Sequence, residues 1–401
     1  MKALFYTREF PPYVYGGAGV HVEYLAAELA KLMEVEVRSF GDQKEAGGNL
    51  TVKGFPFDNP VFNQADDKLK AVLKTLSTCV QMNADAVDAD VVHCHTWYAQ
   101  FAGILTKLCY GIPLVITTHS LEPLRPWKRE QLGRGYDASS WVEKTAIEMA
   151  DAVIAVSKET KQDVLKYFDV EEDKIKVIYN GIDLQQYVAT EGADTLEEYG
   201  IDPSRPYVLF VGRITRQKGI IHLVNAIKYI DPGTQVVLCA GAPDTPEIAK
   251  EMEDSVKEVK KARNNVIWID KMLDKQAVIQ LYSHADVFCC PSIYEPFGII
   301  NIEAMACNTA VVASAVGGIK EVVVDGETGL LIPLKQQDKA PFEPVDPDQF
   351  SRDLADGINK VVADPELRAS MARKGRKRVE DHFDWIAIAR QVEQLYQSLL
   401  V

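Results

Sequence analysis

Residues 285–306 of the chain read ADVFCCPSIYEPFGIINIEAMA. The apolar run up to Cys290 predicts a short buried strand, and residues 299–306 predict the helix that follows it. Glu295 then lies in the connecting loop, and Glu303 lies early in the helix. A helix start offers unpaired N–H groups and a positive dipole end, so phosphate can bind there while nearby carboxylates bind sugar hydroxyls. The segment therefore indicates a nucleotide-sugar site beside an α/β sheet.

Ordinary explanations stay open for the same two acids. Glu303 can be an acid that the dipole of a first helical turn favours, and Glu295 can be a solvated loop charge. The pair alone does not separate these interpretations from a binding site.

Composition places the chain among globular enzymes with two domains. Its 401 residues are too many for one comfortable core, and 47% hydrophobic with 25% charged residues is the balance of a globular protein. The first residues read as a strand rather than a signal peptide, and no apolar run approaches a membrane span. We therefore expect a cytoplasmic protein.

Charge and cysteine content exclude several classes of partner. A formal charge of −14 argues against a general nucleic-acid or anionic-membrane surface. The seven cysteines have no paired spacing and lie mostly in apolar segments, so we expect reduced core thiols rather than a structural zinc site. Small molecules are the expected partners, and a homo-oligomer stays possible.

Strand-like runs alternate with amphipathic helical runs along the whole chain, which indicates βαβ units with parallel sheets. The expected strands are 3–7, 35–39, 91–95, 114–118, 152–156, 176–178, 208–211, 236–240, 266–269, 287–290 and 310–313. Five or six strands in each half suffice for a doubly wound sheet, whose ligands lie at the carboxyl ends of the strands. We expect two Rossmann-like domains that face a central cleft.

A polar stretch at residues 186–206 separates the two strand series and is expected to be the linker. We accordingly divide the chain into an N-terminal acceptor-binding domain (1–187), a C-terminal nucleotide-sugar-binding domain (188–382) and a final helix (383–401). That helix is amphipathic and can dock on either domain, including back on the first.

Two loops carry features of phosphate binding. Gly16 and Gly17 stand at a helix start, where backbone N–H groups can approach a phosphate, although they can also form only a tight turn. The spacing is not GxGxxG and no acid closes the next strand, so NAD binding is disfavoured. Arg213 and Lys218 follow the first strand of the second half and can clamp a diphosphate, with solvated loop charges as the alternative.

Histidines mark two strand ends in the first half. His93 and His95 share one face of a strand, but the sequence offers no third ligand near them, so a core or substrate-positioning role is favoured over zinc. His119 lies at the carboxyl end of its strand and points into the expected cleft, or it is a structural histidine. Residues 122–136 then form a basic loop that can hold an anionic acceptor or simply be solvated. Its cations are Arg125, Lys128, Arg129 and Arg134.

Together these motifs resemble the retaining GT-B glycosyltransferases of family 4. That family has a glycine-rich first loop, a G-R-x(4)-K-G segment and E-P-F-G-x(4)-E, and all three occur here in order over essentially the whole chain. The resemblance implies that Glu303 holds the ribose, Glu295 the transferred sugar, and Arg213 with Lys218 the diphosphate. The implied nucleotide-sugar site comprises Gly16, Gly17, Arg213, Lys218, Glu295, Phe297, Gly298, Ile299 and Glu303.

The segments REFPPYVYGGAGVHVEYLA, HCHTWYA, THSLEPLRPWKREQLGRGY and VGRITRQKGIIHL are similar to one bacterial branch of that family. This branch comprises the ADP-glucose-dependent glycogen synthases now regarded as maltose-1-phosphate synthases. The likeness implies α-1,4 transfer of glucose from ADP-glucose to glucose 1-phosphate or to a glucan end. It implies catalytic roles for His119, Glu295, Arg213 and Lys218, and an acceptor side formed by His95, Trp97, Arg125, Lys128, Arg129 and Arg134.

The implied mechanism is front-face transfer with retention, in which the departing ADP phosphate takes the proton of the incoming hydroxyl. No metal and no further cofactor are expected. Three alternatives stay open: a UDP-glucose-dependent transferase of the sucrose-synthase type, a nucleotide-sugar epimerase with the same architecture, and a non-catalytic carbohydrate-binding protein.

Overall fold

The computed structural model describes residues 1–14, 16–57 and 60–400 and divides into two compact units. The first unit comprises Met1–Gly181 and Trp385–Val401, and the second comprises Ile182–Asp384. These divisions lie a few residues from the boundaries 187/188 and 382/383 expected from the sequence. None of the helices within the described ranges has the length and apolar character that spanning a membrane demands.

The first unit contains an eight-stranded sheet with strand order β3-β4-β2-β1-β5-β6-β7-β8. Its strands are β1 (Lys2–Thr7), β2 (Glu34–Phe40), β3 (Lys44–Gly47), β4 (Leu50–Phe55), β5 (Val91–His95), β6 (Leu114–Thr118), β7 (Ala152–Ala155) and β8 (Ile175–Val177). All neighbours are parallel except β3 and β4, which form an antiparallel pair at one edge. The sequence pattern did not predict this pair, because β3 is exposed along its whole length and shows no apolar alternation.

Seven α-helices cover this sheet or extend beside it in the described part of the first unit. They are α1 (Gly17–Leu29), α2 (Asp67–Ala84), α3 (Trp97–Tyr110), α4 (Lys128–Leu132), α5 (Gly135–Met149), α6 (Lys158–Tyr167) and α15 (Trp385–Ser398), with 3₁₀ turns at Pro60–Gln64, Glu122–Leu124 and Glu172–Lys174. Residues 122–136, expected as a loop, thus contain a 3₁₀ turn, α4 and the start of α5.

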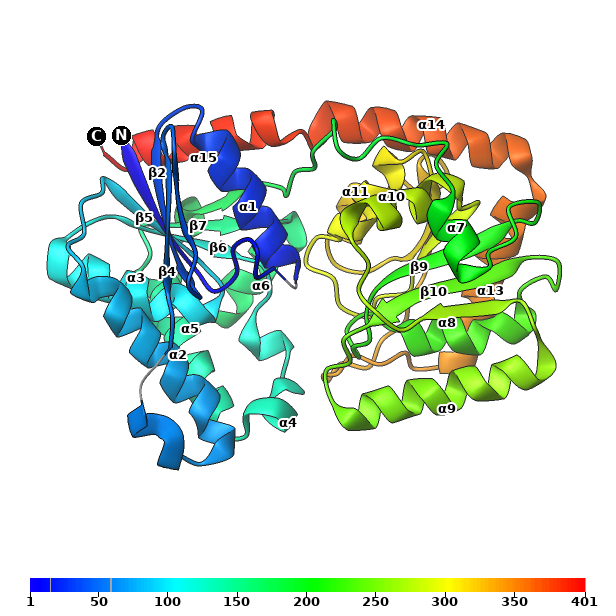
Figure 1. The fold of residues 1–401 in the computed structure, drawn as a ribbon, viewed down its shortest axis with the longest axis horizontal. Helices are drawn as coiled ribbons and strands as arrows, with labels where there is room; N and C mark the ends of the chain where they lie inside the picture. The colour runs from blue at the N-terminus through cyan, green and yellow to red at the C-terminus, as the bar shows by residue number, and fades with distance from the viewer. Residues whose placement is uncertain (15, 58–59, 401) are drawn as a thin grey trace. The chain divides into compact units, whose positions relative to one another are not determined.

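The last helix of the chain, α15, packs on α1 of the first unit (Figure 1, red beside blue). Its buried face includes Trp385, Ile388 and Val392, which share a core cluster with Val22 and Leu25 of α1. The amphipathic helix that the sequence left free to dock on either domain therefore completes the first unit.

The second unit contains a six-stranded, fully parallel sheet with strand order β11-β10-β9-β12-β13-β14. Its strands are β9 (Tyr207–Arg213), β10 (Gln235–Gly241), β11 (Val266–Ile269), β12 (Val287–Cys290), β13 (Ala310–Ser314) and β14 (Gly329–Ile332). This is the doubly wound Rossmann order, and it reverses between β9 and β12. Ligands of such sheets bind at the carboxyl ends of the strands beside the reversal.

The helices of the second unit are α7 (Asp194–Tyr199), α8 (Ile220–Ala226), α9 (Pro246–Ala262), α10 (Lys275–His284), α11 (Ile299–Ala306), α12 (Ile319–Val322), α13 (Pro347–Ala363) and α14 (Pro365–His382), with a 3₁₀ turn at Ile227–Tyr229. The expected linker at residues 186–206 is wrong, since these residues belong to the second unit. They include α7, which contacts α10 and buries Leu196. Polar composition concealed this short helix, whose apolar contribution is small.

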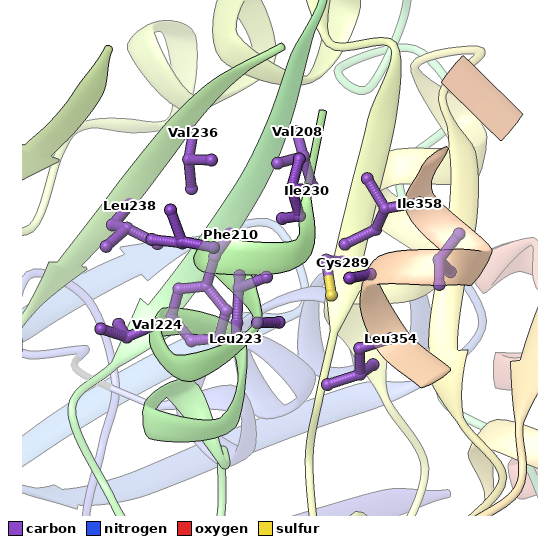
Figure 2. Close-up of a cluster of buried hydrophobic side chains, with 14 of the residues drawn as sticks. Val208, Phe210, Leu223, Val224, Ile230, Val236, Leu238, Cys289, Leu354 and Ile358 are labelled. Atoms are coloured by element: carbon purple, nitrogen blue, oxygen red, sulfur yellow. The ribbon is translucent and has the colours of Figure 1, made fainter. Parts of the chain in front are cut away.

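The core of the second unit lies between its sheet and the helices α8 and α13. Figure 2 shows Phe210 of β9 directed toward Leu223 and Val224 of α8, with Leu354 of α13 beside Cys289 of β12. All of these side chains are buried. The buried core holds the strand ends in place, so the loops that follow them start from fixed positions.

Candidate active site

Three loops meet at the carboxyl ends of β9, β12 and β13, which are neighbours in the second sheet. The N–H of Ile293 donates to the carbonyl of Gln217 at 3.0 Å, which joins the loop after β12 to the loop after β9. The N–H of Gly318 donates to the carbonyl of Glu295 at 2.9 Å, which joins the loop after β13. The segment that carries Glu295 is therefore fixed by its main chain from both sides.

Two glycines permit this close approach. Gly219 has a φ of 60°, and a Cβ there would lie 2.1 Å from the carbonyl oxygen of Pro291. Gly317 has a φ of 48°, and a Cβ there would lie 2.0 Å from the carbonyl oxygen of Glu295. A side chain at either position would push the loops apart.

Lys218 and Glu295 form an ion pair at the reversal point of the sheet. Lys218 Nζ donates to Glu295 Oε2 at 2.6 Å, and Ser292 Oγ donates to the same oxygen at 3.2 Å. Glu295 is only 6% exposed, so its interpretation as a solvated loop charge is wrong. Burial acts to lower the pKa of Lys218, but the charge of Glu295, its hydrogen bond, and the nearby Cys290 and Glu303 together outweigh burial, so the pKa is raised. The lysine is thus firmly cationic.

Arg213, the last residue of β9, pairs with a different acid. Its guanidinium forms a hydrogen-bonded ion pair with Asp244, which follows β10. The two cations that the sequence assigned to one diphosphate thus each have their own carboxylate. A diphosphate that used both would have to compete with Asp244 and Glu295.

Glu303 lies on α11 and accepts hydrogen bonds from two tyrosines. The Tyr187 hydroxyl donates to one carboxylate oxygen at 3.1 Å and the Tyr282 hydroxyl to the other at 3.0 Å. Burial raises the pKa of Glu303, which the two tyrosines partly oppose. Since α11 begins at Ile299, Glu303 is in its second turn, so the interpretation as a first-turn acid is wrong. Each carboxylate oxygen has a second lone pair for a ligand hydroxyl.

The residues between these acids contribute main chain rather than side chains. The Phe297 ring is buried and packs edge-on against Phe383, 5.6 Å between centroids. Gly298 has a φ of 101° and caps the start of α11. At Gly298 and Ile299, the groups expected to contact a ligand are therefore main-chain N–H groups at a helix start.

In the first unit, the loop that contains Gly16 is held by a hydrogen bond to an acid that the sequence did not single out. Gly16 N–H donates to Glu9 Oε2 at 2.9 Å, and a Cβ on Gly19 would lie 2.7 Å from the same oxygen. The Gly16 amide assigned to phosphate is thus already bonded to Glu9. Gly17 begins α1.

Three histidines of the first unit meet, although they are far apart in the sequence. His95 Nδ1 and His119 Nε2 share a hydrogen bond at 3.1 Å, and the His21 ring lies 4.6 Å from that of His119. His21 Nδ1 bonds Asn180 Oδ1 at 2.7 Å. Burial lowers the pKa of His21 to about 4 and that of His95 and His119 well below the usual value. All three are neutral at pH 7.

This cluster corrects the expectation that no third histidine lies near His95. The ligand atoms of His21, His95 and His119 lie within 4.8 Å of one another, and the buried His21 Nε2 has no hydrogen-bond partner among the residues that the structure describes. Neutral imidazoles are zinc ligands, so these three could hold such an ion if the His95–His119 hydrogen bond were given up. The other histidine of the strand, His93, is occupied by Tyr396 at 2.6 Å and by Thr117.

The cations at 122–136 separate into two groups. Arg125 and Lys128 approach Glu122 Oε1 at 4.0 and 3.7 Å. By contrast, Arg129 is half exposed and pairs with Asp137. Arg134 is exposed just before α5. The four expected acceptor residues thus do not form a single cluster around one carboxylate.

Trp97, also expected on the acceptor side, is buried at the start of α3. It belongs to a small cluster with Leu132 and Tyr136 and stacks on Tyr98, 4.2 Å between ring centroids. Its indole is thus a packing element, and the ring beside the cations is that of Tyr98.

Comparison with known proteins agrees with these two units. Residues 15–186 match the family model described as Glycosyltransferase Family 4, and residues 193–341 match that of Glycosyl transferases group 1. An α-maltose-1-phosphate synthase of Mycolicibacterium smegmatis is 48% identical over 406 residues, which cover 100% of both chains. The chain belongs to glycosyltransferase family 4.

Further similar proteins support the family assignment of this glycosyltransferase and identify its fold. An α-maltose-1-phosphate synthase of Mycobacterium tuberculosis is 45% identical over 403 residues, again 100% of both chains. The solved sucrose-phosphate synthase of Thermosynechococcus elongatus superposes with a TM-score of 0.80 at 26% identity, over 100% of this chain and 99% of that one. The protein is a GT-B enzyme with two Rossmann-like domains, as the sequence motifs predicted.

Several residues of this glycosyltransferase site lack a motif of their own. Most of them lie shortly after a strand end or carry a polar group within an otherwise apolar helix, and five of them lie inside the segments that resemble the family branch. They are Arg8, Glu9, His21, Tyr98, Glu122, Asn180, Tyr187, Asp244 and Tyr282. Glu9 and Glu122 have partners nearby in the sequence, but the partners of the others come from distant segments, so sequence spacing did not indicate them.

Proposed function

We propose that this glycosyltransferase of α-glucan synthesis moves α-glucose from ADP-glucose to O4 of glucose 1-phosphate and forms maltose 1-phosphate. Full-length similarity to two proteins named α-maltose-1-phosphate synthase supports the reaction. The observation that carries the choice of acceptor is the pair Arg125 and Lys128 on one buried carboxylate. These two cations share a single carboxylate, so a phosphate acceptor supplies the further negative charge that a neutral glucan does not.

In this proposal the second unit binds the nucleotide sugar. Glu303 holds the ribose hydroxyls, Lys218 with Arg213 holds the diphosphate, and Glu295 holds the transferred glucose. Binding replaces part of the Lys218–Glu295 pair with contacts to phosphate and sugar. The first unit provides His119 near the transferred glucose, and His95, Arg125 and Lys128 for the acceptor.

The proposed transfer retains the α configuration. The bond between glucose C1 and the β-phosphate oxygen breaks, and a bond from C1 to the acceptor O4 forms on the same face. The proton of the O4 hydroxyl passes to the departing phosphate oxygen, and ADP leaves. Lys218 stabilises the negative charge that grows on that phosphate, which is the kind of contact that lowers a transition-state barrier most.

A donor-by-acceptor matrix tests the proposal. ADP-glucose and UDP-glucose are each combined with glucose 1-phosphate, a maltooligosaccharide or glycogen, and the product and its anomer are identified by NMR. We expect the highest kcat/KM for ADP-glucose with glucose 1-phosphate and an α-linked product. A preference for UDP-glucose with a non-glucan acceptor would contradict it, as would an isomerised sugar formed from ADP-glucose alone.

We further propose that the reaction needs no metal, because the lysine and arginine already supply positive charge for the diphosphate. Dialysis against EDTA is expected to leave kcat/KM within about two-fold of the untreated enzyme, far less than the loss of a Lewis acid would cause. A large loss of kcat/KM that Zn²⁺ reverses in the wild-type enzyme would contradict the proposal. If Zn²⁺ fails to reverse the loss in His21→Ala, the ion would be assigned to the histidine cluster.

A further inference from the structure

Two cations from distant segments of the first unit lie over the same aromatic ring. The guanidinium carbon of Arg8 is 4.0 Å from the ring centroid of Tyr98, and Lys128 Nζ is 5.6 Å from it. Arg8 follows β1, Tyr98 is on the first turn of α3, and Lys128 begins α4. The chain thus gathers Arg8 and Lys128 at one ring although it carries a net charge of −14.

Arg125 joins this group through Glu122. Its NH1 lies 4.0 Å from the same Glu122 oxygen that Lys128 approaches at 3.7 Å, and it donates to Ser120 Oγ at 2.6 Å. Arg125 Nε is buried and has no hydrogen-bond partner within the described ranges. Glu122 itself is 1% exposed and is fixed by a hydrogen bond from Ser139 Oγ at 2.8 Å. Glu122 therefore orients Arg125 and Lys128 without giving either a close ion pair.

Glu122 and Glu143 do not offset the charges of Arg125 and Lys128 in full. The only other carboxylate with a contact to Glu122 among the described residues is Glu143, which accepts the Glu122 N–H at 2.7 Å. Burial and the charge of Glu122 raise the pKa of Glu143 well above its usual value, which favours its neutral form. Burial, and then the charge of Arg125, lower the pKa of Lys128, which means that both disfavour the charged form of the lysine. A bound anion would favour that charged form.

We propose that Arg8 completes, with Arg125 and Lys128, the subsite for the phosphate of the sugar acceptor, and that Tyr98 holds Arg8 in place. The inference rests on the proposed function, because it requires an acceptor that carries a phosphate monoester. Two guanidinium forks and one ammonium match the several oxygens of such a dianion. Stacking on Tyr98 fixes the plane of the Arg8 fork before the ligand arrives. Glu122 is a positioning residue for the other two cations.

The test compares binding of acceptor and donor in Arg8→Ala. Isothermal titration measures glucose 1-phosphate binding to the ADP complex and ADP binding to the free enzyme, and initial rates give KM for glucose 1-phosphate. A charge-assisted hydrogen bond contributes enough for us to expect a rise of about 10- to 100-fold in both acceptor constants. We expect the Kd for ADP to change by less than about two-fold.

Arg390→Ala is the matched control, since it removes an exposed arginine of the same unit on α15. It is expected to leave all three constants unchanged. Arg8→Lys keeps the charge but loses the fork, so its KM is expected between those of wild type and Arg8→Ala. If Arg8→Ala does not fold, Arg8→Lys decides by the same comparison.

The outcomes separate the two proposals. A wild-type enzyme that neither binds nor uses glucose 1-phosphate would overturn the proposed function and this inference with it. A wild-type enzyme that uses glucose 1-phosphate, with an unchanged KM in the Arg8 variants, would overturn the role of Arg8 alone. Weaker ADP binding in Arg8→Ala would assign Arg8 to the donor instead.

Discussion

Replacing Lys218 with alanine is expected to lower kcat by about 10²- to 10³-fold, the loss seen when a charged or polar group is removed from a developing negative charge. Lys218 Nζ is within hydrogen-bond distance of Glu295 at the carboxyl end of β9, and its pKa is raised, so it carries its charge throughout the neutral range. The measurement is steady-state turnover of ADP-glucose with a saturating acceptor.

Loss of Lys218 also leaves Glu295 buried without its cation, which can destabilise the loop independently of chemistry. Lys218→Arg keeps the charge, and the double variant Lys218→Ala with Glu295→Gln removes the unpaired carboxylate. If the effect is electrostatic, the double variant folds normally and stays inactive. Lys261→Ala, an exposed lysine on α9, is the control. Near-wild-type transfer by Lys218→Ala would remove the diphosphate assignment.

Mild acid is expected to destabilise the first unit through its four buried histidines. His21, His93, His95 and His119 all have a pKa lowered by burial, to about 4 for His21. In the unfolded chain each titrates near the ordinary value of about 6.5. Between these limits the unfolded state binds protons that the folded state does not, so the free energy of unfolding falls as the pH falls.

The expected size is about 1.4 kcal/mol per histidine for each pH unit below 6.5, or about 6 kcal/mol at pH 5.5 if all four stay neutral. That is a large part of the stability of a typical domain. Hydrogen exchange of first-unit peptides at pH 7.5, 6.5 and 5.5 measures the loss. His21→Asn should reduce the pH dependence of the free energy of unfolding by the contribution of one histidine. Equal protection at pH 7.5 and 5.5 would show that the rings take up protons when folded.

The sequence predicted most of the fold because strands buried on both faces have a distinctive apolar pattern. The segment from Cys290 to Glu303 forms the strand, loop and helix that its pattern indicates. The exposed edge strand β3 and the small helix α7 bury little apolar surface, so composition concealed them. For the same reason, the polar residues from 186 onward were expected to be a linker, although they belong to the second unit.

Partner choice among charged residues was harder to predict. Arg213 and Lys218 are close in sequence, yet one pairs with Asp244 and the other with Glu295. Spacing identifies residues that share a loop, but the acid that reaches each of them comes from another strand end. His21 likewise meets His119 only because β1 and β6 lie in one sheet with β5 between them.

The return of α15 to the first unit has a consequence for synthesis of the protein. The second unit is one continuous segment, whereas the first unit emerges from the ribosome long before Trp385 and Tyr396 exist. Until they arrive, the apolar face of α1 is uncovered and His93 lacks its Tyr396 partner. The part of the chain that is made first is therefore the last to be completed, and it needs protection from aggregation for the whole time that the second unit is being made.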